Sequence, residues 1–206
     1  MKNVSSGAPK PFRLNLRGFF TVSGLVDNNK ISVVNNDKTL AATIREVSHL
    51  TGTFTLRSGR QASEYFDKYR FEANPAILSE IAKRMVDLIP PGTEILAGLE
   101  LGGVPVVTML SHYSGIPAAF IRKKAKEYGT AKLAEGADVS GKNVLIVEDV
   151  VTSGGQVVLS TDDLRSLGAH VTHIICVIDR EEGGTENLAS NEIKLISLFK
   201  KSDLVE

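Results

Sequence analysis

Two adjacent acids and a run of small residues are the groups in this sequence best suited to chemistry. Glu148 and Asp149 follow an apolar run at 144–147, and Thr152-Ser153-Gly154-Gly155 comes soon after them. Carboxylates can accept hydrogen bonds from vicinal hydroxyls or stabilise a developing positive charge. Small residues at the start of a helix let backbone N–H groups surround a phosphate. The combination predicts a site for a sugar phosphate.

Each half of this string, taken alone, also fits an ordinary structural role. A helix-capping turn is common, and so are acids on a protein surface. A Walker loop is excluded because no lysine follows Gly154 and Gly155. The occurrence of both halves in one short stretch favours the sugar-phosphate site.

Cations follow two other apolar runs. Arg122, Lys123, Lys124 and Lys126 come after the run at 118–121, and Arg180 comes after the run at 170–178. A cationic cluster is usually a solvated face, but at the carboxyl end of a parallel strand it could also neutralise a diphosphate. Arg180 could belong to a polar turn, although its planar guanidinium is a natural partner for a ring that bears a carboxylate.

The pattern of apolar residues predicts the elements that position these groups. We expect strands at 95–99, 118–121, 144–147 and 170–178, helices at 104–113 and 156–167, and a polar stretch at 122–142. Continuously apolar strands that alternate with helices indicate a parallel sheet covered on both faces. Ligands bind such sheets at the carboxyl ends of the strands, where all of these groups fall. We therefore expect Glu148 and Asp149 where the sheet meets solvent.

The part before the first sheet strand is less regular. We predict a helix at 39–50 that ends near Gly52, a short strand that breaks into a basic turn within 53–60, and an extended piece at 63–71. Asn74-Pro75 should cap and open a helix that Pro90 ends. The apolar residues within 1–38 follow neither the helical nor the strand period for long, so this segment is treated as an extension of unknown structure.

Composition narrows the class of protein. The 206 residues contain 24 Lys plus Arg and 24 Asp plus Glu, so no overall field favours nucleic acid or a membrane surface. No apolar stretch reaches the roughly 18 residues needed to span a bilayer and the N-terminus has no signal-like region, so we expect a cytoplasmic protein. The single cysteine, Cys176, is expected to be buried, and the four histidines have no metal-ligand spacing.

The stretch from 144 to 155 resembles the 5-phosphoribosyl diphosphate (PRPP) signature of type I phosphoribosyltransferases. The resemblance implies an α/β fold with a central parallel sheet flanked by helices and a small hood. It also implies that Glu148 and Asp149 contact the ribose hydroxyls and that Asp149 favours an oxocarbenium-like transition state. The 5-phosphate would then be held by Val151, Thr152, Ser153, Gly154 and Gly155. Mg²⁺ would accompany the diphosphate, held mainly by PRPP, with protein ligands unknown.

A second stretch, 120–129, is similar to the mobile catalytic loop of orotate phosphoribosyltransferases. On that resemblance Arg122, Lys123 and Lys126 bind the diphosphate, Arg122 and Lys126 also act in catalysis, and the loop 122–136 reaches the neighbouring subunit of a homodimer. Gly102 and Gly103 match the family's diphosphate loop. Orotate would contact Arg180, Thr152 and Arg57, and Tyr65-Phe66 could stack near the ring, although these aromatics could instead be core.

The chain also departs from the family's pattern. The family often has lysine at the positions of Arg57 and near Gly102, histidine near Tyr128, and Gly-Glu-Gly where this chain has residues 129–132. These differences affect the residues around the diphosphate and the proton donor more than the substrate.

The expected activity is transfer of ribose 5-phosphate from PRPP to orotate, a step of pyrimidine synthesis. The alternatives are transfer to a purine or uracil, and a PRPP-sensing regulator without catalysis. The expected organisation is an extension at 1–38 and a phosphoribosyltransferase domain at 39–206, whose hood comprises about 39–73 and the C-terminal segment.

Overall fold

The centre of the molecule is a six-stranded sheet with the order β5-β4-β3-β6-β7-β8. The computed structural model describes residues 37–55, 59–123 and 133–204. The strands are β3 (Ile95–Leu99), β4 (Ala118–Ile121), β5 (Ala134–Gly136), β6 (Asn143–Val151), β7 (His170–Asp179) and β8 (Lys194–Lys200). All neighbours pair in parallel except β5, which runs antiparallel to β4 at one edge. The predicted parallel sheet is confirmed, and β5 is an addition to it.

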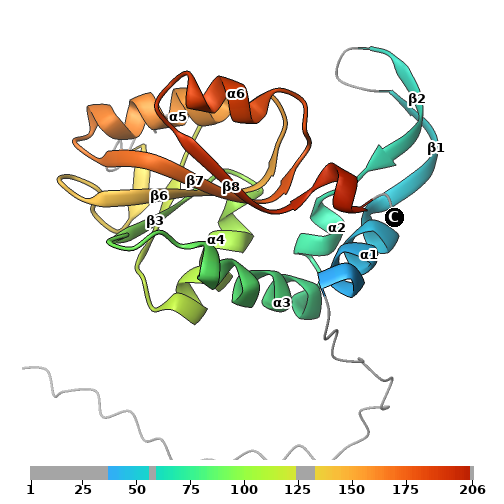
Figure 1. Ribbon diagram of the computed structural model, residues 1–206, viewed down its shortest axis with the longest axis horizontal. Helices are drawn as coiled ribbons and strands as arrows, with labels where there is room; N and C mark the ends of the chain where they lie inside the picture. Colours follow the sequence, from blue (N-terminus) through green and yellow to red (C-terminus); the bar gives the residue numbers. More distant parts are fainter. Residues whose placement is uncertain (1–36, 56–58, 124–132, 205–206) are drawn as a thin grey trace, which may run out of the picture. The chain divides into compact units, whose positions relative to one another are not determined.

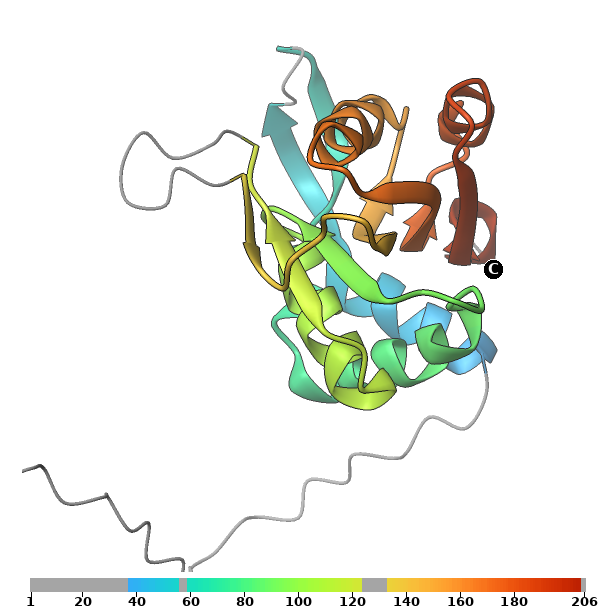
Figure 2. The ribbon, with the colours of Figure 1, turned by 90° about the vertical axis from the view of Figure 1, so that its left-hand side faces the viewer.

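Helices cover both faces of this sheet (Figures 1 and 2). On one side lie α3 (Pro75–Met85), followed by the short η1 (Val86–Leu88), and α4 (Gly103–Ser114). The other side carries α5 (Gly155–Ser166) and α6 (Gly184–Ala189). Each layer has its own buried cluster, one around Ile81, Val107 and Leu145, the other around Leu164, Ile174 and Leu188. The arrangement is that of a parallel sheet whose strands are apolar on both faces.

A smaller unit stands beside the carboxyl ends of the sheet strands. It contains α1 (Asp37–Ser48), the antiparallel pair β1 (His49–Thr55) and β2 (Gln61–Phe66), and α2 (Tyr69–Glu72). The C-terminal η2 (Lys201–Leu204) packs against α1. These elements correspond to the hood expected at about 39–73 and the C-terminus. The division into domains stays a prediction.

Local chemistry explains where several elements begin. The Asn74 side chain accepts hydrogen bonds from the backbone N–H groups of Ala76 and Ile77, and Pro75 occupies the first turn, so the predicted start of α3 is confirmed. On α1, Leu40 and Ile44 are buried on one face. Cys176 is buried as predicted, and its burial raises the pKa of the thiol well above its usual value.

Several predicted boundaries were wrong. Gly52 does not end a helix, because α1 stops at Ser48 and Gly52 lies in β1 where the register with β2 shifts. Residues 69–71 are helical rather than extended, since β2 ends at Phe66. The helix that starts at Pro75 becomes a 3₁₀ turn after Met85, before Pro90 is reached. No element was predicted for β5, α6 or β8.

No helix among residues 37–55, 59–123 and 133–204 is long and apolar enough to cross a membrane. The predicted extension at 1–38 lies almost wholly outside the described residues.

Candidate functional site

The acid pair lies within a strand rather than after one. β6 continues past Glu148 and Asp149 to Val151, because its pairing with β7 persists at Val150 and Val151. Asp149 is fully buried, whereas the sequence predicted two acids where the sheet meets solvent, so that prediction was wrong for Asp149. Its Oδ1 accepts a hydrogen bond of 2.6 Å from the backbone N–H of Val150, and its own N–H donates to Glu148 Oε2 over 3.3 Å. The strand therefore holds the acids in a fixed geometry.

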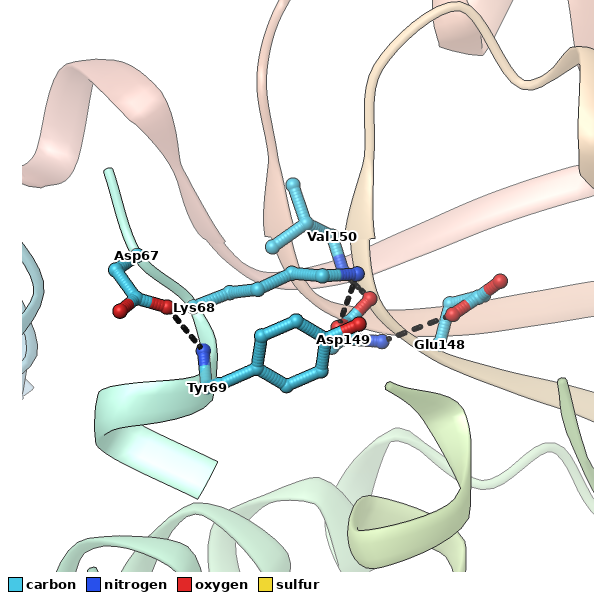
Figure 3. Close-up of polar contacts among 6 residues, drawn as sticks. All are labelled: Asp67, Lys68, Tyr69, Glu148, Asp149 and Val150. Carbon is cyan, nitrogen blue, oxygen red and sulfur yellow. Dashed lines mark hydrogen bonds and ion pairs between the residues drawn. The ribbon is translucent and has the colours of Figure 1, made fainter. Parts of the chain in front are cut away.

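A lysine from the hood binds this buried acid. Lys68, which precedes α2, places its Nζ 2.5 Å from Asp149 Oδ2 (Figure 3). The Lys68 side chain is 33% exposed and that of Asp149 is 1% exposed, so the lysine reaches inward from the surface to the acid. Sequence reasoning missed this contact because no motif marks Lys68. The spacing of Lys68 four residues before Glu72 places those two side chains on one side of a helical turn, but it does not indicate the contact with Asp149.

The electrostatics of this group are unusual. Burial and the neighbouring Asp149 raise the pKa of Glu72 to about 9, so Glu72 is protonated at neutral pH. Burial, together with Asp149, also raises the pKa of Glu148 well above its usual value. Burial lowers the pKa of Lys68, but the ion pair with Asp149 outweighs this effect, and the net shift is upward. The cluster therefore contains one charged lysine beside carboxyl groups that burial keeps from all being ionised at once.

The predicted phosphate loop leads into α5. Thr152 and Ser153 are exposed, and Gly154 adopts a positive φ of 73°, which glycine tolerates without strain, directly before the helix. From α6, the Asn187 side chain donates a hydrogen bond of 2.7 Å to the carbonyl oxygen of Ser153. The loop therefore presents hydroxyls and the N-terminus of α5 together, as an anion site requires. Asn187 is a support that the sequence did not reveal.

The predicted diphosphate loop lies against the acid pair. Gly102 packs so closely on Asp149 that a Cβ atom at this position would overlap Oδ2, so only glycine fits while the acid keeps this position. The loop is also tied to the end of β4, where the backbone N–H of Lys123 donates to Glu100 Oε1 over 2.6 Å. The peptide bond between Glu100 and Leu101 is cis. The predicted diphosphate loop and the predicted ribose acids are thus in direct contact.

A cavity of about 360 Å³ lies between the hood and the ends of β6 and β7. It is lined by Arg45, His49, Glu64, Tyr65, Phe66, Val150, Ile178, Arg180, Lys201 and Leu204. The structure therefore brings Arg180 and the aromatic pair together, as the predicted orotate site requires. Arg180 forms an ion pair of 3.1 Å with Glu182. Neither acid lines this cavity, but Val150, which does line it, donates its backbone N–H to Asp149, so the cavity and the acid pair are separated by one residue.

Part of the predicted site lies outside the described residues. Arg57, Lys126 and Tyr128 are among residues 56–58 and 124–132, so their predicted roles stay predictions. Arg122 is half-buried at the end of β4, where its backbone N–H donates to the Leu133 carbonyl oxygen. Within the described part of the chain, no group of three or more His, Cys, Asp or Glu residues could hold a metal ion.

Comparison with known proteins places this site in a family. Residues 69–198 match the model of the phosphoribosyl transferase domain. The chain is 54% identical over 168 residues to an orotate phosphoribosyltransferase of a Nocardioides species, an alignment that covers 82% of this chain and 94% of the relative. The chain belongs to the orotate phosphoribosyltransferase family. This alignment is longer than the stretch from residue 69 to the C-terminus, so it extends into the hood.

Solved structures of the family have the same fold. The orotate phosphoribosyltransferase of Mycobacterium tuberculosis, in complex with Fe(III) dicitrate, superposes with a TM-score of 0.75 at 32% identity, and the match covers 82% of this chain and 99% of that one. The same enzyme in complex with PRPP superposes with a TM-score of 0.70 at 29% identity, covering 82% of this chain and 98% of that one. The type I phosphoribosyltransferase fold predicted from the sequence is therefore confirmed.

Proposed function

We propose that this chain transfers ribose 5-phosphate from PRPP to orotate, giving orotidine 5-phosphate and diphosphate in pyrimidine synthesis. The observation that carries the proposal is the shared residue Val150, which lines the Arg180 cavity and donates to Asp149. A base in that cavity and a sugar on the acid pair would be neighbours. The predicted phosphate loop follows the same acids along the chain, and Gly102 of the predicted diphosphate loop packs on Asp149.

The reaction requires one bond to form and one to break. A ring nitrogen of orotate attacks C1 of the ribose, and the bond between C1 and the diphosphate oxygen breaks, with its electron pair leaving on diphosphate. The ring nitrogen also releases its proton, which ends on diphosphate or solvent. Positive charge develops on the sugar ring as the leaving group departs, and Asp149 and Glu148 are the nearest acids to balance it. Because the orotate ring nitrogen is acidic, little activation of the nucleophile is needed.

Positioning supplies the rest of the catalysis. The hydroxyls of Thr152 and Ser153 and the N-terminus of α5 would bind the 5-phosphate, and Arg122, Lys123 and Lys126 would bind the diphosphate. The guanidinium of Arg180 would bind the carboxylate of orotate, with Thr152 and Arg57 as further contacts. Fixing both reactants in this way converts a bimolecular encounter into a reaction within one complex.

Three further features belong to the proposal. Mg²⁺ supplies charge neutralisation to the diphosphate when it is bound, and PRPP oxygens are the hard ligands that this ion prefers. Calorimetry of PRPP binding with Mg²⁺ and with EDTA tests this requirement: equal affinities would contradict it. The homodimer, with loop 122–136 reaching the neighbouring subunit, and the cytoplasmic location stay predictions from the sequence.

The direct test is identification of the product. Incubation of the protein with PRPP, orotate and Mg²⁺ should yield orotidine 5-phosphate by mass spectrometry and one diphosphate for each orotate consumed. The Asp149→Asn variant should lose most of this turnover. Binding of PRPP without consumption of any base would favour the regulatory alternative instead.

A further inference from the structure

The position of Lys68 is fixed before any ligand binds. The backbone N–H of Asp67 donates to the Ser48 carbonyl oxygen over 2.8 Å, which ties the end of β2 to the end of α1. The Asp67 side chain accepts from the N–H of Tyr69 over 3.2 Å at the start of α2. The Lys68 Nζ also lies 5.3 Å from the centre of the Tyr69 ring (Figure 3). The lysine therefore projects from an anchored segment over an aromatic face.

The carboxylate that Lys68 contacts is enclosed on three sides. Oδ1 accepts from Val150 on the strand, Oδ2 pairs with Lys68 from the hood, and the same Oδ2 lies where a side chain at Gly102 would be. The ammonium of Lys68 thus stands where the predicted ribose acids and the predicted diphosphate loop meet.

Without Lys68, the charge at this point would be adverse for an anionic donor. Glu72 is protonated at neutral pH and adds no charge, but the Asp149 carboxylate would lose its ion pair, and Lys68 also interacts with Glu148. PRPP brings a diphosphate and a phosphate into the same region. An ammonium at this position offsets the acids and prevents like charges from opposing the ligand.

We propose that Lys68 is a positioning residue of the PRPP site: it holds the Asp149 carboxylate against Gly102 in the orientation that meets the sugar, and it balances the acids that the donor approaches. This inference rests on the proposed function, since it assigns Asp149 to the ribose. The alternative is a structural ion pair that joins the hood to the sheet. The two differ in what they affect, because a structural pair changes stability while a positioning lysine changes affinity for PRPP.

The experiment compares three substitutions at Lys68 with a matched control. Lys68→Met removes the charge, Lys68→Gln retains a neutral donor in case the methionine variant folds poorly, and Lys68→Arg retains the charge. Lys142→Met is the control, because Lys142 also forms an ion pair, 2.9 Å from Glu94, but at the opposite end of β6. For each protein, PRPP affinity with Mg²⁺ is measured by calorimetry and the thermal midpoint is measured without ligand.

We expect Lys68→Met and Lys68→Gln to weaken PRPP binding roughly tenfold or more, Lys68→Arg to restore most of it, and Lys142→Met to bind like the wild type. Unchanged PRPP affinity in the folded Met or Gln variant, with only a lower thermal midpoint, would overturn the inference in favour of a structural pair. Failure of Lys68→Arg to restore binding would overturn the charge role. If the wild type itself does not bind PRPP, the proposed function fails first, and the inference fails with it.

Discussion

At the scale of single residues, the site depends on which of its buried acids are ionised. Asp149 is held by Val150 and Lys68, while Glu72 lies beside it without solvent to stabilise a second charge. In such a group, protonation of one member is as important as its position. The protonation of these acids can be detected in how the stability of the protein depends on pH.

The raised pKa of Glu72 predicts a specific dependence of stability on pH. Its value of about 9 in the folded protein lies above its ordinary value of 4.5, so folding favours the protonated form. The stabilisation is complete below about 4.5 and is lost as the pH rises through about 9. The thermal midpoint of the wild type should therefore fall more than that of Glu72→Gln between about pH 6 and about pH 9, by at least roughly 3 °C.

The control for this prediction is Glu46→Gln, which changes an exposed acid on α1. Its thermal midpoint should follow that of the wild type across the same pH range. Parallel curves for the wild type and Glu72→Gln would mean that Glu72 is not protonated in the folded protein.

Arg180 should decide between acidic and neutral bases. Arg180 lines the cavity beside Tyr65 and Phe66, where the carboxylate of orotate would lie. Arg180→Ala should raise the KM for orotate roughly tenfold or more and leave PRPP affinity unchanged, because a charge-assisted contact to the base alone is lost. Steady-state kinetics with each substrate varied in turn measures both effects. An equal loss for PRPP would remove Arg180 from the base site.

At the scale of elements, the loops at the carboxyl ends of the strands are supported from neighbouring helices. Asn187 on α6 holds the Ser153 carbonyl oxygen, and it therefore fixes the phosphate loop before α5. Asn187→Ala should raise the KM for PRPP severalfold with little change in kcat, since the loop then loses one fixed hydrogen bond of about 1 kcal/mol.

The matched control for this variant is Asn191→Ala. Asn191 also donates its side-chain amide to a backbone carbonyl, that of Asn187, over 2.8 Å, but this bond lies within the α6 region rather than on the loop. If both substitutions change the KM for PRPP equally, the effect comes from α6 as a whole and not from the bond to Ser153.

The elements also explain what could be predicted from the sequence. β3, β4 and β7 are short runs of apolar residues between turns, so their length, composition and flanking residues identify them. β6 was predicted too short because its acids look like a strand end, although hydrogen bonds from β7 continue past them. β5 has only three residues and depends on its pairing with β4.

The parts of the site that are contiguous in the sequence were predictable. The acids, the phosphate loop and the loop at Gly102 are each encoded in a short stretch, and the structure brings these stretches together. Lys68 and Asn187 act on residues that are distant in sequence, and no local pattern indicates such contacts. They follow from how the hood and α6 pack on the sheet.

At the scale of the whole molecule, the predicted dimer makes one subunit complete the site of another. Lys126 lies on the loop 122–136, which the sequence predicts to reach the neighbouring subunit. If so, the Asp149→Asn and Lys126→Ala proteins should each be inactive alone. A mixture of the two should recover up to about a quarter of wild-type activity after the subunits exchange, because each hybrid dimer has one complete site.

Size-exclusion chromatography with light scattering establishes the mass of each protein and of the mixture. Dimers that exchange subunits but regain no activity would place Lys126 in its own subunit's site. A monomeric wild type would contradict the dimer itself.

A panel of bases tests whether orotate is the acceptor that this protein selects. Initial rates with PRPP and Mg²⁺ are measured for orotate, uracil, adenine, guanine and hypoxanthine under one set of conditions. We expect kcat/KM for orotate to exceed that for every other base by roughly a hundredfold or more, because Arg180 has a carboxylate to bind in orotate alone. A neutral base used as efficiently as orotate would contradict it.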